Sequence, residues 1–295
     1  MTNQKIKVLY IAGPPRSGST IIARLLGEVR GFVNVGEAAR FLFDRKQQAR
    51  NAPCGCGQSI TECEFWKDIA RTIPPGLADA GAKLVRMRRF PSLMQAQHSD
   101  ASEYRAIATG ISDVYRRVLS DTGCDVIVDS SKNPANGLLV SIAPEIELHV
   151  LHVTRNPHQV VASWTKKKGY LVTHRPTDVI AWWWSYNILS EALRSKARTY
   201  RRIRYEDFVS NPGSMLERVT ADVVSAPLPT PFLNGNVASL HLQHALAGNP
   251  DKLTVGQVNI GESRAASAGP RKLLIDLLTF PLQLRYRYLL SGTDQ

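Results

Sequence analysis

The sequence lacks long apolar segments and internal repeats and has few cysteines, and each lack excludes a class of protein. No stretch offers the roughly 20 consecutive apolar residues that a membrane-spanning helix needs. The apolar run at residues 8–12 leads into a glycine-rich turn instead of a signal-peptide cleavage site, so secretion is not expected. Four cysteines in 295 residues are too few for a disulfide scaffold. We therefore expect a cytoplasmic protein with an ordinary packed core.

Acidic residues are in the minority. The chain has 37 lysines and arginines against 25 acidic residues, which gives a net charge of +12. Such a balance favours anionic ligands, nucleic acid or an acidic membrane surface as partners. No RNP, zinc-finger or basic-zipper pattern accompanies the basic clusters at 86–89, 166–168 and 194–204, so nucleic acid is not the expected partner.

Short apolar runs alternate with helical patterns along the chain. This order predicts a single α/β domain over 1–295, with a P-loop-like parallel sheet and helices on both faces. The expected strands are 8–12, 32–35, 126–128, 148–153 and 202–205, and the expected helices are 19–29, 102–120, 158–165, 177–196 and 212–223. Residues 44–100 break the alternation and are interpreted as an insertion over the sheet edge. Residues 225–270, rich in Pro, Gly and Asn, are interpreted as a long loop that binds ligand.

Residues 13–20, Gly-Pro-Pro-Arg-Ser-Gly-Ser-Thr, have the spacing of a phosphate-binding loop between a strand and a helix. Gly13 and Gly18 keep the glycine spacing of the Walker A pattern, and Thr20 keeps its hydroxyl. Ser19 stands at the lysine position, and Arg16 carries the cation instead. Loop amides and the helix N-terminus favour phosphate binding. The missing lysine indicates a ligand other than a nucleoside triphosphate.

Polar side chains follow the carboxyl end of every expected strand. These residues are Arg16, Glu37, 129–132, Arg155 and Glu206. Parallel strands end at one edge of a sheet, and ligands of open α/β sheets bind there. The sequence therefore predicts one site at that edge.

Three of these segments resemble motifs of the sulfotransferases that use PAPS, 3′-phosphoadenosine 5′-phosphosulfate. Residues 16–20 resemble the 5′-phosphosulfate loop in its Arg-first form, as in carbohydrate and tyrosyl-protein sulfotransferases. Residues 154–163 resemble the 3′-phosphate motif, in which an arginine and a serine eight residues later bind the phosphate. Residues 204–208, followed by Asn-Pro at 211–212, resemble a third landmark near the nucleotide. The resemblance covers residues 6–212 and implies PAPS binding by these residues: Arg16, Ser17, Gly18, Ser19, Thr20, Arg155, Ser163 and Tyr205.

The resemblance also implies catalytic residues. Residues 33–37 are similar to the strand-end Gly-Glu of tyrosyl-protein and some bacterial sulfotransferases, whose glutamate takes the acceptor's proton, and this assigns a general base to Glu37. Lys132 is by analogy a second cation beside Arg16. Residues 248–252 resemble a Gly-Asn-Pro-x-Arg stretch, with Lys252 as a 3′-phosphate contact. The alternative interpretations are a helix-capping carboxylate for Glu37, a surface lysine for Lys132 and a solvated loop for residues 248–252. Arg40 stands three residues after the glutamate where the family often has an arginine two residues after it, so no role is transferred to it.

The implied activity is transfer of a sulfuryl group from PAPS to a hydroxyl of a sugar, lipid, phenol or tyrosine, with release of PAP and no metal requirement. A P-loop kinase with Asp129 as a Walker B aspartate is one alternative, and a non-catalytic nucleotide- or polyanion-binding protein is another. The sequence identifies neither the acceptor nor the oligomeric state.

Three further segments have more than one interpretation. Cys54, Cys56 and Cys63 lack a fourth zinc ligand nearby, which favours a tight glycine-rich turn or a local disulfide. The tryptophans at 182–184 favour core packing over contact with an acceptor. The basic amphipathic tail at 272–290 favours a docked helix, although peripheral membrane contact stays open.

Overall fold

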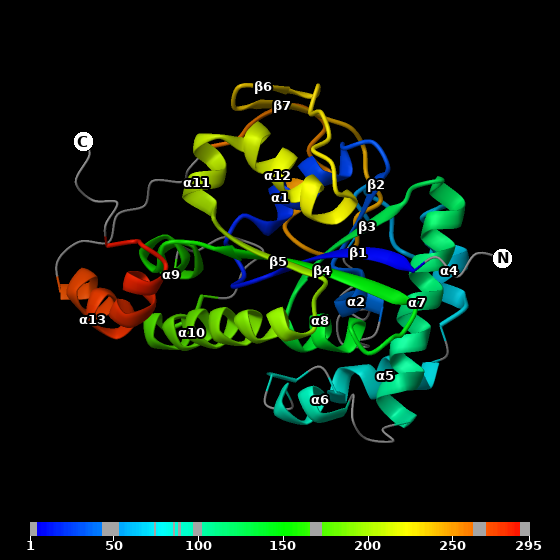
Figure 1. Cartoon of the computed structure of the whole chain (residues 1–295), viewed down its shortest axis with the longest axis horizontal. Coiled ribbons are helices and arrows are strands. Elements are labelled where there is room, and N and C mark those ends of the chain that lie inside the picture. The colour runs from blue at the N-terminus through cyan, green and yellow to red at the C-terminus, as the bar shows by residue number, and fades with distance from the viewer. Residues whose placement is uncertain are drawn as a thin grey trace.

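A five-stranded parallel sheet forms the centre of the protein (Figure 1). The computed structural model describes residues 5–42, 53–73, 75–84, 86–87, 90–96, 102–165, 173–261 and 270–289. The strand order is β2-β3-β1-β4-β5, and every neighbouring pair is parallel. The strands are β1 (Ile6–Ala12), β2 (Phe32–Gly36), β3 (Val126–Lys132), β4 (Ile146–Thr154) and β5 (Thr199–Arg204). The predicted α/β class and all five predicted strands are confirmed.

Helices cover both faces of this sheet, as predicted. Val8 and Tyr10 of β1 pack into the core on one face, whereas Leu9 and Ile11 pack into the core on the other. Strands buried on both sides are expected to be apolar throughout, and β1 is. Figure 1 shows α1, α11 and α12 above the strands and α2, α8 and α10 below them. The helices that cover the sheet are α1 (Ser19–Gly27), α2 (Ala38–Leu42), α7 (Ser102–Thr122), α8 (Pro134–Val140), α10 (Pro176–Ala192), α11 (Tyr205–Ser210) and α12 (Pro212–Val224).

Asn-Pro pairs begin three of the helices that follow strands or turns. The side chains of Asn133, Asn156 and Asn211 each accept a hydrogen bond from a backbone N–H in the first turn of α8, α9 (Pro157–Thr165) and α12. Proline at the first helical position fixes a helical φ and needs no amide donor. The helix predicted over 158–165 is therefore confirmed, and it starts at Pro157.

The described part of the segment interpreted as an insertion contains three short helices. They are α4 (Lys67–Arg71), α5 (Pro75–Leu84) and α6 (Phe90–Ala96). α5 contacts α7, and α6 contacts α8, so both helices extend the layer on the lower face (Figure 1). Within the described ranges, no helix combines the length and the hydropathy that crossing a bilayer requires.

The segment 225–270, predicted to be a long loop that binds ligand, is irregular over most of its described residues but also contains short regular elements. A short 3₁₀ helix, η3 (Pro250–Leu253), and an antiparallel sheet of three short strands form there, namely β6 (Leu233–Asn234), β7 (Val237–Leu240) and β8 (Gly256–Asn259). Gly235-Asn236 forms the two-residue connection between β6 and β7, a hairpin signal visible in the sequence. Ala238 and Leu240 bury their side chains in the core beside α1. These strands are too short for their alternation to stand out.

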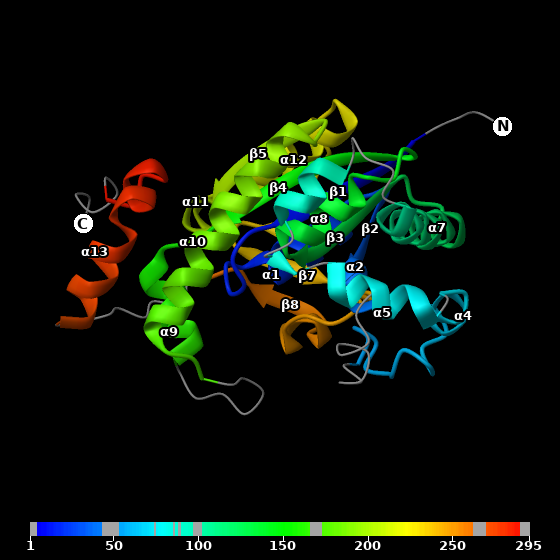
Figure 2. The ribbon, with the colours of Figure 1, turned by 90° about the horizontal axis from the view of Figure 1, so that it is seen from below.

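The tail forms α13 (Pro270–Arg285), which packs against α9 and α10 (Figure 2). Trp183 is 1% exposed and packs in a hydrophobic cluster formed by α9, α10 and α13, whereas Trp182 is 39% exposed. The indole of Trp184 donates to the carbonyl of Leu278 on α13, at 2.8 Å. The docked tail helix and the core tryptophan were both predicted.

Candidate active site

A cavity of about 860 Å³ opens at the carboxyl ends of the parallel strands. The phosphate-binding loop, the strand ends of β2, β3 and β4, η3 and the end of β8 contribute to its wall. The sequence-predicted site residues that line it are Arg16, Gly18, Ser19, Thr20, Glu37, Lys132, Arg155, Ser163, Tyr205 and Lys252. Among the residues predicted to bind the nucleotide or to act in catalysis, Ser17 alone does not, and it is 1% exposed.

The two predicted phosphate motifs touch each other although 147 residues separate them. Arg16 donates from Nε to the hydroxyl of Ser163 at 3.0 Å, and Arg155 donates from Nη1 to the carbonyl oxygen of Arg16 at 3.0 Å. The Arg155 guanidinium lies 4.6 Å from the centre of the Tyr205 ring. Stacking on an aromatic face leaves the edge of a guanidinium available for a planar anion.

A buried hydrogen-bond donor lies where the two phosphate motifs meet. Within the described residues, Nε of Arg155 is buried and has no hydrogen-bond partner. A buried donor without a partner costs about 1–3 kcal/mol, more for a charged group, and an arriving anion would recover that cost. The hydroxyl of Ser17 shares this condition.

Glu37 forms an ion-paired group at the end of β2. The side chain accepts hydrogen bonds from Nζ of Lys132 and from Nη1 of Arg40, the latter at 2.6 Å. Burial alone would raise the pKa of this carboxyl, but the charges of Lys132 and Arg40 outweigh burial and hold the pKa below its ordinary value. Glu37 is therefore an ionised carboxylate at neutral pH, as a proton acceptor must be.

The sequence profile of the sulfotransferase family matches residues 9–223. The chain belongs to the sulfotransferase family. Its fold is similar to that of the sulfotransferase domain from the Synechococcus PCC 7002 olefin synthase, with a TM-score of 0.53 and 17% identity over 95% of each chain. No protein of curated function matched the sequence.

Two of the strand-end acids predicted to converge do not line the cavity of this sulfotransferase. The carboxylate of Asp129 is fully buried and accepts hydrogen bonds from the amides of Ala39 and Ser131 and from the hydroxyl of Tyr115, at 2.7–2.9 Å. Burial raises the pKa of Asp129. Glu206 accepts a bond from the amide of Asn156 and links the ends of β4 and β5. Both acids act within the sulfotransferase fold and do not face the ligand space.

Lys252 lines the cavity from η3, on the side where Glu37 lies. Its ammonium donates to the carbonyl of Pro53, and burial lowers its pKa. The charges that act on it include those of Glu37 and Lys132. Its contact with a 3′-phosphate stays a prediction.

Sequence reasoning gave no role to several residues of the sulfotransferase cavity. Arg40 pairs with Glu37 across one helical turn, and this i,i+3 spacing could have identified it. Arg24 lines the cavity from α1 and donates to the carbonyl oxygens of Asp251 and His241, which ties α1 to the late segment. Gln159 and Trp164 of α9 also contribute to the wall, and no local pattern distinguishes them.

Proposed function

We propose that this sulfotransferase transfers a sulfuryl group from PAPS to a hydroxyl-bearing acceptor and releases PAP. One observation carries the proposal: the Arg16 loop, the Arg155 and Ser163 side chains that contact it, and the Glu37–Lys132 pair all line a single cavity. A donor with phosphates at both ends requires two cationic positions in the same pocket, and the hydroxyl chemistry requires a base between or beside them.

The phosphate-loop motif assigns the 5′-phosphosulfate to the loop from Arg16 to Thr20. The positive φ of Gly18, 86°, turns the chain into α1, and the first amides of a helix favour the binding of an anion. The Arg155 guanidinium and the Ser163 hydroxyl are the proposed 3′-phosphate contacts, consistent with the unpartnered Nε of Arg155.

Transfer needs one bond to form, one to break and one proton to move. The acceptor oxygen attacks sulfur, the bond from sulfur to the 5′-phosphate oxygen breaks, and the acceptor proton passes to the Glu37 carboxylate. Arg16 and Lys132 stabilise the charge that develops on the departing phosphate and on the sulfuryl oxygens. These steps rely on positioning and electrostatics and need no metal.

The kinase alternative depends on Asp129 as a magnesium ligand. Asp129 is fully buried, and both its oxygens accept hydrogen bonds within the protein. Ser19 occupies the position of the Walker lysine. These observations favour PAPS over ATP with magnesium as the nucleotide.

Thermal unfolding with ligands tests the donor. PAP without magnesium should raise the melting temperature, and ATP with magnesium should not. The reverse result would refute the proposed donor. A screen of labelled PAPS against sugar, lipid, phenol and tyrosine acceptors then identifies the acceptor class.

A Glu37→Gln variant tests the base, because glutamine keeps the size of the side chain and removes its proton affinity. We expect binding of PAP to persist and transfer of labelled sulfate to fall by about 100-fold or more. The matched control is Glu217→Gln on the exposed surface of α12, which should transfer at the wild-type rate. Undiminished transfer by Glu37→Gln would refute the base assignment. Binding of PAP without transfer from PAPS by the wild-type protein, whatever the acceptor, would favour the non-catalytic alternative.

A further inference from the structure

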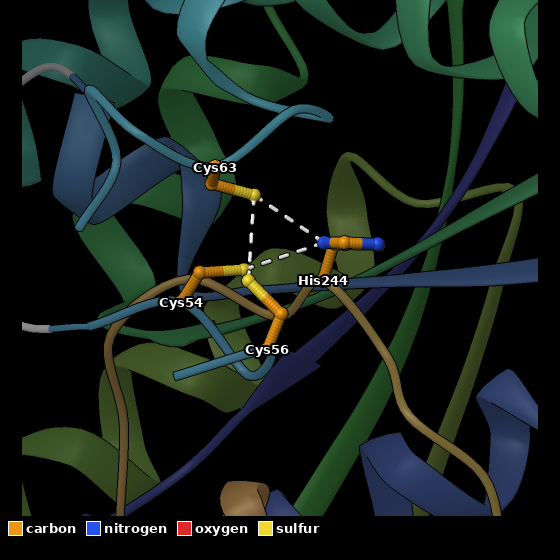
Figure 3. A group of neighbouring side chains, drawn as sticks. All are labelled: Cys54, Cys56, Cys63 and His244. Carbon is orange, nitrogen blue, oxygen red and sulfur yellow. Dashed lines mark hydrogen bonds between the residues drawn. The ribbon is translucent and has the colours of Figure 1, made fainter. Parts of the chain in front are cut away.

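Three cysteines and one histidine converge outside the cavity (Figure 3). Cys54, Cys56 and Cys63 belong to the turn before α4, and His244 comes from the segment between β7 and η3. The ligand atoms of all four side chains lie within 4.8 Å of one another. Three pairs of these atoms lie closer together: 3.6 Å from Cys56 Sγ to Cys63 Sγ, 3.3 Å from Cys63 Sγ to His244 Nδ1 and 3.7 Å from Cys54 Sγ to His244 Nδ1.

These separations agree with the edges of a coordination tetrahedron. Zinc bonds of about 2.3 Å to sulfur and about 2.0 Å to nitrogen place neighbouring ligand atoms roughly 3.5–3.8 Å apart. A set of four protein ligands without an open position is typical of a structural zinc site. Three thiolates and an imidazole are also ligands that zinc prefers. The missing fourth ligand, which made the sequence favour a turn or disulfide, is therefore His244.

A disulfide does not account for the cluster. All four cysteines of the chain are free, and the 3.6 Å between Cys56 and Cys63 is well beyond the roughly 2.05 Å of a disulfide bond.

The surrounding residues hold the four ligands in position. A Cβ on Gly55 would lie 2.1 Å from the carbonyl oxygen of Gln243, so only glycine lets the cysteine turn approach the histidine segment this closely. The amide of Gly55 donates to Ala245, and the indole of Trp66 donates to the carbonyl of His244 at 2.5 Å. Phe65 stacks on the imidazole with 5.0 Å between ring centres and 14° between planes. Such outer contacts orient metal ligands.

We propose that Cys54, Cys56, Cys63 and His244 bind a structural zinc ion that fastens the turn before α4 to the late segment of the chain. The segment that carries His244 continues into Leu246, whose backbone pairs with Val35 and Glu37 at 3.0 and 2.8 Å. The zinc ion thereby supports the position of the base-bearing strand end and of the wall that contains Lys252. This site does not depend on the identity of the sulfuryl donor, so it can fail or hold separately from the proposed function.

Metal content of the full-length protein tests the proposal. We expect elemental analysis of the wild-type protein, purified without a metal-affinity tag, to find about one zinc per chain. Replacement by Co²⁺ should give the intense visible absorption of a tetrahedral thiolate site. X-ray absorption at the zinc edge should report sulfur near 2.3 Å and nitrogen near 2.0 Å in a three-to-one ratio.

Matched variants assign the ligands. Cys63→Ser and His244→Ala should lose most of the zinc, whereas Cys124→Ser, which changes the one cysteine outside the cluster, should keep it. The wild-type measurements do not depend on whether the ligand variants fold. Absence of zinc in the wild-type protein, iron in its place, a Cys56–Cys63 disulfide in mass spectra, or full zinc content in folded Cys63→Ser would each overturn the proposal.

Discussion

One added methyl group at Gly18 should weaken both folding and ligand binding. Its φ is 86°, and a Cβ there would lie 2.1 Å from two ring carbons of Tyr205. In a Gly18→Ala variant, the left-handed backbone costs about 1–2 kcal/mol. The overlap with the ring adds to that cost, because either the loop or Tyr205 must move.

Tyr205 cannot move without a consequence for the proposed phosphate site. The ring is 6% exposed, its hydroxyl donates to the carbonyl of Gly261 at 3.2 Å, and the Arg155 guanidinium lies over it. Displacement of the ring withdraws the surface on which Arg155 stacks, and displacement of the loop moves the carbonyl of Arg16 that Arg155 contacts. We expect PAP to bind Gly18→Ala at least about tenfold more weakly, a loss of about 1.4 kcal/mol.

Gly123 supplies a matched control for this variant. It has a φ of 66° after α7, and a Cβ there would meet no atom within 4 Å, so Gly123→Ala has the backbone strain without the overlap. Urea unfolding should show a loss of about 1–2 kcal/mol for Gly123→Ala and a larger loss for Gly18→Ala. Calorimetric titration should show weaker PAP binding for Gly18→Ala alone. Wild-type affinity for PAP in Gly18→Ala would refute the role given to the loop and to Tyr205.

Two further changes have defined outcomes. Arg155→Lys should weaken PAP binding by about tenfold or more, because an ammonium neither makes a bidentate contact nor stacks on a ring as a guanidinium does. The exposed control Arg198→Lys should bind PAP with wild-type affinity. Equal PAP affinities of the two variants would contradict the assignment of Arg155. Burial lowers the pKa of His152 to about 4, and the neutral ring accepts from Tyr200 and donates to Asn187. Because the pKa of His152 is lower in the folded protein than in the unfolded chain, its full contribution to stability is present above the unfolded pKa of about 6.5 and falls by about 3 kcal/mol towards pH 4. Urea unfolding at a series of pH values should show this slope in the wild type and a flatter slope in His152→Gln. Parallel slopes for the two proteins would contradict this role of His152.

The parallel sheet and the phosphate motifs were predictable because their signals are local. Each buried strand is a short apolar run, and each motif carries its spacing within about ten residues, as in Arg155 and Ser163. Convergence then followed from topology, because parallel strands end at one edge. The wall residues from α9 had no comparable signal, since any helix residue has the same local context until its neighbours are known.

Contacts between distant segments could not be predicted from spacing. His244 lies 181 residues after Cys63, and a lone histidine in a loop carries no indication of its partners. For two acids that follow strands the error is the reverse: their positions in the sequence predicted that they face the ligand site, and in the structure they do not. Asp129 has the position of a ligand-binding group, yet the nearby amide of Ala39 and the hydroxyl of Tyr115 reach it from other elements and occupy it. Sequence gives the position of a group along a strand end, while burial decides whether that group faces ligand or protein.

Backbone conformation gives independent support for the catalytic assignments. Among the described residues, five that are not glycine have positive φ, and they include Arg16 at 72° and Lys132 at 66°. A third, Ala247 at 53°, also lines the cavity. Left-handed backbone costs a residue with a Cβ about 1–2 kcal/mol, and glycine would avoid that cost at either position. Glycine would also remove the cation, so the strain is retained where a positive charge must face the ligand space. Both proposed catalytic cations adopt this conformation, Lys132 as the last residue of β3 and Arg16 in the loop that follows β1, which supports the proposal that they stabilise the charge that sulfuryl transfer develops.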